Sequence, residues 1–276
     1  MFYLILAFCS SAAVSIVMRF SDRRVSNSLG MLAVNYVACT ALAALECSDG
    51  LLPMVSGLGS TLAMGCLNGV FYLSGFVLFQ RSVRRSGVVL SATFMKLSLL
   101  VTMLISVVFF GEQPAMIHWL GFLLAVGAIV LINYDGSGMG GFQPALLVLL
   151  VMGGLCDGMS KVYEELGTAS LSPQFLFYTF LVAMVLCAAL AWRKQQLPGK
   201  WEWIYGLAIG IPNFYSARFM LNALNTVPGV IAYPVYSVAG ILLVTLAGLI
   251  LFREKLSRRQ WLALGIILVA LIMLNV

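Results

Sequence analysis

The segments FFGEQPAMIHWLGFLLAVGAIVLIN (residues 109–133) and LFREKLSRRQWLALGIILVALIMLN (residues 251–275) follow one pattern. Six matches lie at a displacement of 142 residues: Phe110, Glu112, Trp119, Leu120, Ala128 and Asn133 recur as Phe252, Glu254, Trp261, Leu262, Ala270 and Asn275. Matches of Leu, Val and Ala between hydrophobic segments arise easily by chance, whereas matched Glu, Trp and Asn residues do not. The two segments are therefore copies of one sequence unit.

The same displacement continues upstream without gaps. Four further matches join Arg19 to Lys161, Tyr36 to Tyr178, Ser74 to Ser216 and Gly87 to Gly229. The repeat therefore covers the whole chain and predicts two halves, 1–136 and 140–276, with the same order of elements.

The composition is that of an integral membrane protein. Hydrophobic residues make up 62% of the 276 and charged residues only 9%, whereas a soluble domain has about 45–50% apolar and about 25% charged residues. A helix needs about 20 apolar residues to cross a bilayer core. Ten such stretches are predicted, at 2–18, 28–46, 57–80, 87–110, 115–133, 143–163, 172–192, 203–222, 228–252 and 259–275. We expect an all-α protein with ten transmembrane helices.

Each half holds five predicted helices, an odd number, so the second half enters the membrane inverted relative to the first. The loops 19–27, 81–86, 193–202 and 253–259 all lie on one face of the membrane and hold 13 of the 16 basic residues. We call this side the basic face. The positive-inside rule places it in the cytoplasm and both termini outside. The predicted location is a plasma (inner) membrane.

Each half closes with an aromatic residue, a variable residue and a glutamate, Phe110-Gly111-Glu112 and Phe252-Arg253-Glu254, before a Gly- or Ala-rich last helix. With Pro234 in AYPVYSVAGILLV (residues 232–244), the whole chain resembles the drug/metabolite transporter (DMT) superfamily, in its EamA-like branch. The resemblance implies gradient-driven transport of amino acids, other metabolites, sugar nucleotides or sugar phosphates. It also implies a central cavity lined by six helices, with 115–133 and 259–275 at the rim.

One position departs from the pattern of this superfamily. Many members have a proline in the fourth helix as well as in the ninth, but here Ala92 stands at the position that matches Pro234. We therefore expect the fourth helix, 87–110, to be less kinked than in those relatives.

Two charged residues lie deep in predicted membrane segments. Lys96 is the tenth residue of the 87–110 segment, and an ion near the bilayer centre costs about 2.5–3.5 kcal/mol on insertion scales. Such a lysine is predicted to bind an anionic substrate group or to carry a proton, and the alternative is a structural pair with a carboxylate. Asp157, whose repeat equivalent is Ser15, is the candidate partner of Lys96 and a candidate proton site.

Seven further residues complete the predicted substrate pocket: Asn68, Tyr72, Asn213, Tyr215, Arg218, Tyr233 and Tyr236. Arg218 could bind a carboxylate or phosphate, or extend to the membrane interface. For a single Tyr or Asn the alternative is an interhelical hydrogen bond. Lys161 and Glu164 are expected to form an ordinary interfacial ion pair. Glu112 and Glu254 are expected to cap the helix that follows each of them.

The leading hypothesis is a secondary active transporter, an exporter or exchanger of a small polar metabolite with an anionic group, such as an amino acid or organic anion. It would work by alternating access, with H⁺ as the coupling ion or with none. The alternatives are an exporter of organic cations or drugs, and a flippase of a lipid or lipid-linked sugar. The sequence shows no pairing of a nucleophile with a base, so we predict neither an enzyme nor catalytic residues.

The remaining expectations concern partners. The six cysteines show no C-x-x-C spacing and predict neither a disulfide framework nor a metal site. No cofactor and no nucleic acid are expected. The predicted partners are the small-molecule substrate and the lipid bilayer, and the chain is expected to be a monomer or homodimer.

Overall fold

The computed structural model describes residues 2–48, 50–111, 113–133, 144–195, 197–224 and 229–274, without the side chains of residues 132–133, 164, 221, 224 and 229–234. No strand occurs in this part of the chain. Its helices are α1 (Phe2–Ser21), α2 (Ser28–Glu46), α3 (Leu58–Ser86), α4 (Val88–Lys96), α5 (Leu99–Phe110), α6 (Met116–Asn133), α7 (Pro144–Leu166), the 3₁₀ helix η2 (Ala169–Leu171), α8 (Ser172–Arg193), α9 (Lys200–Leu224), α10 (Gly229–Ile250) and α11 (Arg258–Met273).

Nine of the ten predicted segments each correspond to one α-helix, and the fourth corresponds to α4 and α5 together. Six segments of the described chain are long and apolar enough to cross a membrane, among them Val88–Phe110. Met116–Leu131 and Val235–Ile250 are shorter apolar helices. The all-α, multi-pass membrane architecture expected from the sequence is thus confirmed.

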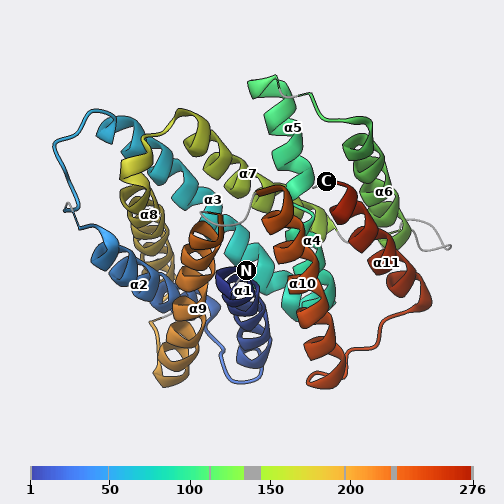
Figure 1. The fold of residues 1–276 in the computed structure, drawn as a ribbon. Helices are drawn as coiled ribbons and strands as arrows, with labels where there is room; N and C mark the ends of the chain where they lie inside the picture. Colours follow the sequence, from blue (N-terminus) through green and yellow to red (C-terminus); the bar gives the residue numbers. More distant parts are fainter. Residues whose placement is uncertain are drawn as a thin grey trace.

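The helices pack as one elongated bundle (Figure 1). α2 and α8 lie side by side at one end, and α6 and α11 pack on each other at the opposite end. Between these pairs, α1 packs against α9 and α10, while α3 packs against α7 and α8. The segments that the resemblance places at the rim, α6 and α11, are therefore remote from the centre of the bundle.

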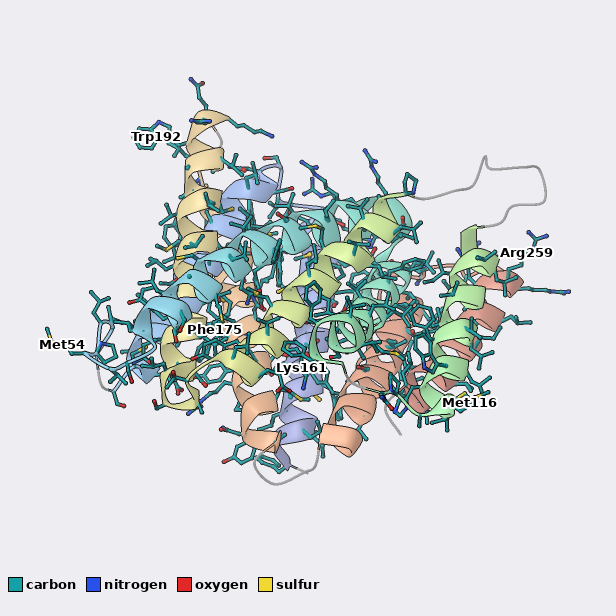
Figure 2. The ribbon with its side chains drawn as sticks, turned by 90° about the horizontal axis from the view of Figure 1, so that it is seen from above. Met54, Met116, Lys161, Phe175, Trp192 and Arg259 are labelled. Atoms are coloured by element: carbon teal, nitrogen blue, oxygen red, sulfur yellow. The ribbon has the colours of Figure 1, made fainter. Side chains whose placement is uncertain are left out.

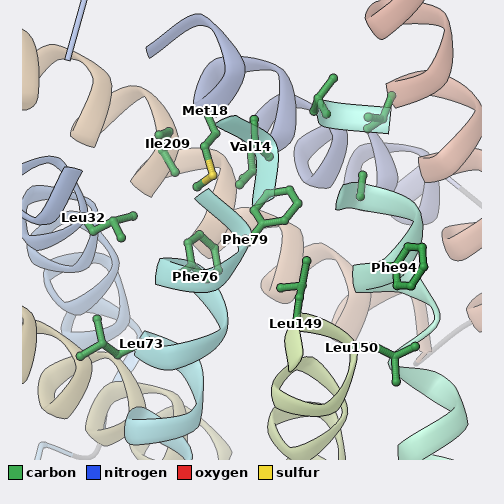
Figure 3. Close-up of a cluster of buried hydrophobic side chains, with 14 of the residues drawn as sticks. Val14, Met18, Leu32, Leu73, Phe76, Phe79, Phe94, Leu149, Leu150 and Ile209 are labelled. Carbon is green, nitrogen blue, oxygen red and sulfur yellow. The ribbon is translucent and has the colours of Figure 1, made fainter. Parts of the chain in front are cut away.

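The hydrophobic core runs through the bundle and includes residues of α1, α3, α7 and α9 (Figure 3). Met18 of α1, Leu149 of α7 and Ile209 of α9 are fully buried, and Phe79 of α3 is almost fully buried. Phe76 and Phe79 are one helical turn apart and so share a face of α3. The central helices are thereby held in fixed positions around the polar residues they carry.

Pairs of glycines bring the helices of the two halves into close contact. Gly65 and Gly69 of α3 face α8, and Gly206 and Gly210 of α9 face α2. A Cβ on Gly69 would lie 2.6 Å from a backbone oxygen of α8, and one on Gly210 would lie 2.7 Å from a backbone oxygen of α2. Small residues spaced by four allow this backbone approach in membrane proteins.

The fourth predicted helix is interrupted directly after Lys96. Leu100 donates its N–H to the carbonyl of Leu97 at 3.0 Å, and Val101 donates to Ser98 at 2.9 Å. These bonds run from residue i to i−3, so Leu100 does not donate to the carbonyl of Lys96 as it would in a regular α-helix. Irregular backbone at membrane depth is tolerated where protein or a water-filled cavity surrounds it.

The absence of a proline at Ala92 therefore does not make the fourth helix continuous, and its kink relative to other family members stays a prediction. The fourth helix is interrupted although it lacks a proline, because the chain tightens into a 3₁₀-like turn at Leu97 and Ser98. By contrast, α10 contains Pro234 and continues from Gly229 to Ile250.

Candidate functional site

Lys96 lies at the junction of α1, α4 and α10. Its ammonium donates to the hydroxyl of Ser11 at 3.3 Å and lies 3.7 Å from the centre of the Tyr236 ring. Its Cε lies 3.6 Å from where a Cβ on Gly240 would stand, so the small residue leaves space for the lysine stem. Within the described residues Lys96 forms no ion pair, and its charge is held by a hydroxyl and an aromatic face.

Asp157 on α7 is held by the interrupted segment. Ser98 donates its hydroxyl to the carboxylate of Asp157 at 2.5 Å. Asp157 is exposed although it lies midway along a membrane-spanning helix, whereas Ser98 is buried. Carboxylates at that depth in a membrane helix usually face the interior of the bundle or a water-filled cavity, not lipid.

The predicted direct pair between Lys96 and Asp157 does not form. The two residues interact electrostatically, but no ion pair joins them in the described part of the chain. The reason is that Ser11 and Ser98 hold the two charged groups on separate helices. Sequence reasoning missed Ser98, although it stands two residues after Lys96 in a run of apolar side chains.

Tyr236 extends this charged cluster, which we define as Ser11, Lys96, Ser98, Asp157 and Tyr236. The Tyr236 hydroxyl lies 3.1 Å from the hydroxyl of Ser216, and Ser216 lies within hydrogen-bonding distance, 3.3 Å, of the carbonyl of Ala7. The ring beneath the Lys96 ammonium is therefore fixed by α1 and α9. The cluster draws on both halves of the chain.

A second set of polar residues lies between α2, α3 and α9. Tyr72 donates to the amide oxygen of Asn213 at 3.1 Å, and Asn213 donates to Asn35 at 3.3 Å. Asn213 is buried, and Tyr72 interacts electrostatically with Asp157 and Tyr236. The amide set is therefore close to the charged cluster. Asn35 was not predicted as a site residue, although a single amide in an apolar segment could have indicated it.

The other predicted residues have different surroundings. Asn68 is buried and donates to Thr179 at 3.5 Å, while Tyr215 stacks on Phe219 with ring centres 5.3 Å apart. The predicted pocket therefore divides into a charged cluster, an amide set and residues that pack between helices. The side chain of Tyr233 lies outside the described residues.

Two charged residues singled out in the sequence, Arg218 and Lys161, form ion pairs outside the charged cluster. Arg218 pairs with Glu46 at 2.7 Å and so joins α9 to the end of α2. Lys161 pairs with Glu165, at 2.8 Å, and the side chain of its expected partner Glu164 lies outside the described residues. Both are partly exposed pairs of the kind that contributes little stability.

Glu254 was expected to cap α11, and that expectation is wrong. α11 is capped by Ser257, whose hydroxyl accepts from the Gln260 N–H while the Gln260 side chain accepts from the Ser257 N–H. Glu254 instead binds the start of α4. The backbone of Glu112 lies outside the described residues.

Two surface hollows lie away from the charged cluster. One of about 460 Å³ is lined by Ala189, Trp192, Arg193 and Gln195 at the end of α8, where Trp192 extends outward (Figure 2). The other, of about 270 Å³, is an apolar groove between α6 and α11. Neither is lined by a residue of the charged cluster, so the candidate site rests on the contacts within that cluster and the amide set.

Three comparisons bear on identity. The chain matches a protein of Haemophilus influenzae described as uncharacterized, with 26% identity over 278 residues that cover 95% of this chain and 93% of the relative. It also matches a crystal structure of a protein with a TM-score of 0.61 and 16% identity, over 98% of this chain and 95% of the other, which shows a shared fold. The model of the EamA-like transporter family matches residues 1–134 and again residues 145–276. The chain therefore belongs to the EamA-like transporter family.

Proposed function

We propose that the protein is a secondary active transporter of a small polar metabolite with an anionic group, such as an amino acid or organic anion. The observation that carries this proposal is the charged cluster. It holds a cation, Lys96, and an anion, Asp157, deep in the bundle, with neutral hydroxyls as their closest partners. Charges at this depth are costly, and they are typical of substrate or proton pathways.

The chemistry of the cluster favours a ligand with an anionic group. The present acceptor of the Lys96 ammonium, the Ser11 hydroxyl at 3.3 Å, is neutral, whereas a substrate carboxylate would pair its negative charge with the ammonium in a shorter bond of about 2.7–2.9 Å. A substrate amino group would likewise bring a positive charge to Asp157, whose present donor, the Ser98 hydroxyl, is neutral. An amino acid would use both charges, whereas an organic anion would use Lys96 and leave Asp157 to carry H⁺. An organic cation would have to approach the fixed ammonium, which disfavours a drug exporter.

The pattern of helix contacts supports alternating access by two inverted repeats, 1–136 and 140–276. α1 packs on α9, and their repeat equivalents α7 and α3 also pack together. Likewise α2 packs on α9, and their equivalents α8 and α3 form a pair. Such exchange of equivalent contacts is what a pseudo-two-fold axis in the membrane plane produces. In this proposal the basic face is cytoplasmic, and both termini lie outside a plasma (inner) membrane.

A ligand screen by thermal unfolding tests the proposal. A ligand that binds the folded state at 100 times its Kd stabilises the protein by about 2.7 kcal/mol. Purified protein is heated with amino acids, organic anions and organic cations, and the stabilising compounds are tested again with Lys96→Ala and Asp157→Asn. An amino acid should lose its effect in both variants, and an organic anion only in Lys96→Ala.

Arg218→Ala is the matched control, because it removes a cation from the same bundle that already has a carboxylate partner. It should leave the ligand effect unchanged. Stabilisation that survives Lys96→Ala would show that Lys96 does not bind the substrate. Uptake of the stabilising compound into liposomes then establishes transport. A flippase would instead move labelled lipid between leaflets without taking up small solutes.

A further inference from the structure

Glu254, in the loop before α11, lies across the N-terminus of α4. Its two carboxylate oxygens accept hydrogen bonds from the N–H groups of Val88 at 2.8 Å and Val89 at 3.2 Å. The guanidinium of Arg19, at the end of α1, lies 3.4 Å from the same carboxylate. The first N–H groups of a helix have no partner within it and carry partial positive charge, so a carboxylate is the ligand that suits them.

The local backbone is built around this carboxylate. Gly87 precedes α4 with φ at 83°, a conformation that other residues rarely adopt. A Cβ at Gly87 would lie 2.8 Å from a carboxylate oxygen of Glu254. Only glycine therefore permits both the turn into α4 and the close approach of Glu254.

Further contacts on the basic face join the same elements. Asp22 accepts from Arg19 at 3.3 Å and from Arg84, at the end of α3, at 2.9 Å. Phe20 and Phe252 meet edge to face with ring centres 4.7 Å apart. The ends of α1, α3 and α10 and the start of α4 are thus held together, and they come from both halves of the chain.

On the opposite side of the charged cluster, the described residues show no comparable set of contacts. α4 packs along α10 toward the basic face, where Gly248 contacts Val89. Beyond the interruption, the fourth predicted helix continues as α5. In the described residues α5 makes no extensive contact with α10. This asymmetry indicates a conformation closed at the basic face.

We propose that Glu254 is the latch of the gate on the basic face, and that it must release the N-terminus of α4 before Lys96 and Asp157 become accessible from that side. This inference rests on the proposed alternating access. It assigns to Glu254 a conformational role distinct from substrate binding, because the carboxylate binds backbone and Arg19 and makes no contact with the charged cluster.

Ser15 is a suitable reporter for the gate. It is buried on α1, one turn toward the basic face from Ser11 and one turn before Arg19. Ser15→Cys is nearly isosteric, and the native cysteines, none of which is in a disulfide among the described residues, are replaced by alanine. A charged, membrane-impermeant methanethiosulfonate is applied to sealed vesicles. Vesicles in which Arg23→Cys reacts have the basic face exposed to the reagent, because Arg23 lies in an exposed loop on that face.

Glu202 provides the matched control. Its carboxylate also binds backbone on the basic face, accepting from Asn27 at 3.4 Å and from Gly199 at 3.1 Å. It is buried at the start of α9, beside α2, with which α9 packs closely. Glu202→Gln therefore removes a similar buried charge without touching α4.

Labelling of Ser15→Cys from the basic face should be slow in the otherwise unchanged protein and at least tenfold faster with Glu254→Gln. Glu202→Gln should leave the rate unchanged. Equal rates with and without Glu254→Gln would overturn the latch, and so would equal acceleration by Glu202→Gln. If Glu254→Gln does not fold, Glu254→Asp keeps the charge but shortens the side chain, and an intermediate rate is expected. An unchanged rate in that variant also overturns the proposal.

The labelling rate needs no substrate, so it is independent of the ligand screen. A failed screen with accelerated labelling would remove the proposed substrate class and keep the latch. Confirmed transport with unchanged labelling would remove the latch alone.

Discussion

Replacing Lys96 by methionine separates a substrate-binding lysine from a structural one. The change removes the charge and leaves an unbranched apolar side chain that is one atom shorter. Placing the ammonium at membrane depth costs about 2.5–3.5 kcal/mol. It is offset by the contact with the Tyr236 ring at 3.7 Å, worth about 0.5–2 kcal/mol, and by one long hydrogen bond to Ser11 at 3.3 Å, worth about 1.5 kcal/mol.

The cost and the gains nearly cancel, so Lys96→Met should change the free energy of unfolding by no more than about 1.5 kcal/mol in either direction. The corresponding shift of Tm is at most about 6 °C. A lysine that tied two helices through a buried ion pair would instead cost about 3–5 kcal/mol on removal. The two interpretations therefore differ in the size of the expected loss of stability.

Thermal unfolding in detergent, followed by the fluorescence of the five tryptophans, provides the measurement. Arg218→Met is the comparison variant, because it breaks a partly exposed ion pair and should cost about 0–1 kcal/mol. A fall in Tm of more than about 6 °C with Lys96→Met would refute the reasoning. It would show that Lys96 stabilises the fold through contacts other than those with Ser11 and Tyr236.

Three further predictions follow from the packing and the hydrogen bonds, each measured by thermal unfolding. Gly210→Leu should destabilise the protein by about 1–3 kcal/mol because α9 lies against the backbone of α2, whereas Gly265→Leu, at a glycine of α11 with open space around it, should be neutral or stabilising. Tyr72→Phe should cost about 1–3 kcal/mol, since Asn213 loses its donor in a buried site; a change below about 0.5 kcal/mol would contradict that hydrogen bond. Ser257→Ala should cost about 1 kcal/mol by removing the cap of α11, and an unchanged Tm would argue against the cap.

Much of the fold could be predicted from hydrophobic length alone. The predicted segment 28–46 coincides with α2, and nine of the ten predicted segments each correspond to one helix. The reason is that a bilayer core sets the length of an apolar segment independently of how the helices pack. The interruption after Lys96 was missed because it arises from a tight turn at Leu97 and Ser98, and the expectation considered only proline as a cause of kinks.

The candidate site was predictable in its charges and less so in its contacts. The depth of Lys96 and Asp157 follows from their positions in apolar segments, but the groups that hold them depend on which helices meet. Ser11 and Ser98 are small polar residues that occur throughout membrane helices, so their roles become visible only in three dimensions. The binding of Glu254 to α4 was missed for the same reason, since the two are 166 residues apart in sequence.

The shortness of α4 has a mechanical consequence. Its first residue, Val88, is held by Glu254 on the basic face, and its last residue is Lys96. Nine helical residues span about 13 Å, too short a rod to bend appreciably. In the proposed mechanism, an anion that displaces Lys96 would therefore move α4 as a rigid body and displace the N–H groups that Glu254 binds, so substrate binding and opening of the gate would be coupled.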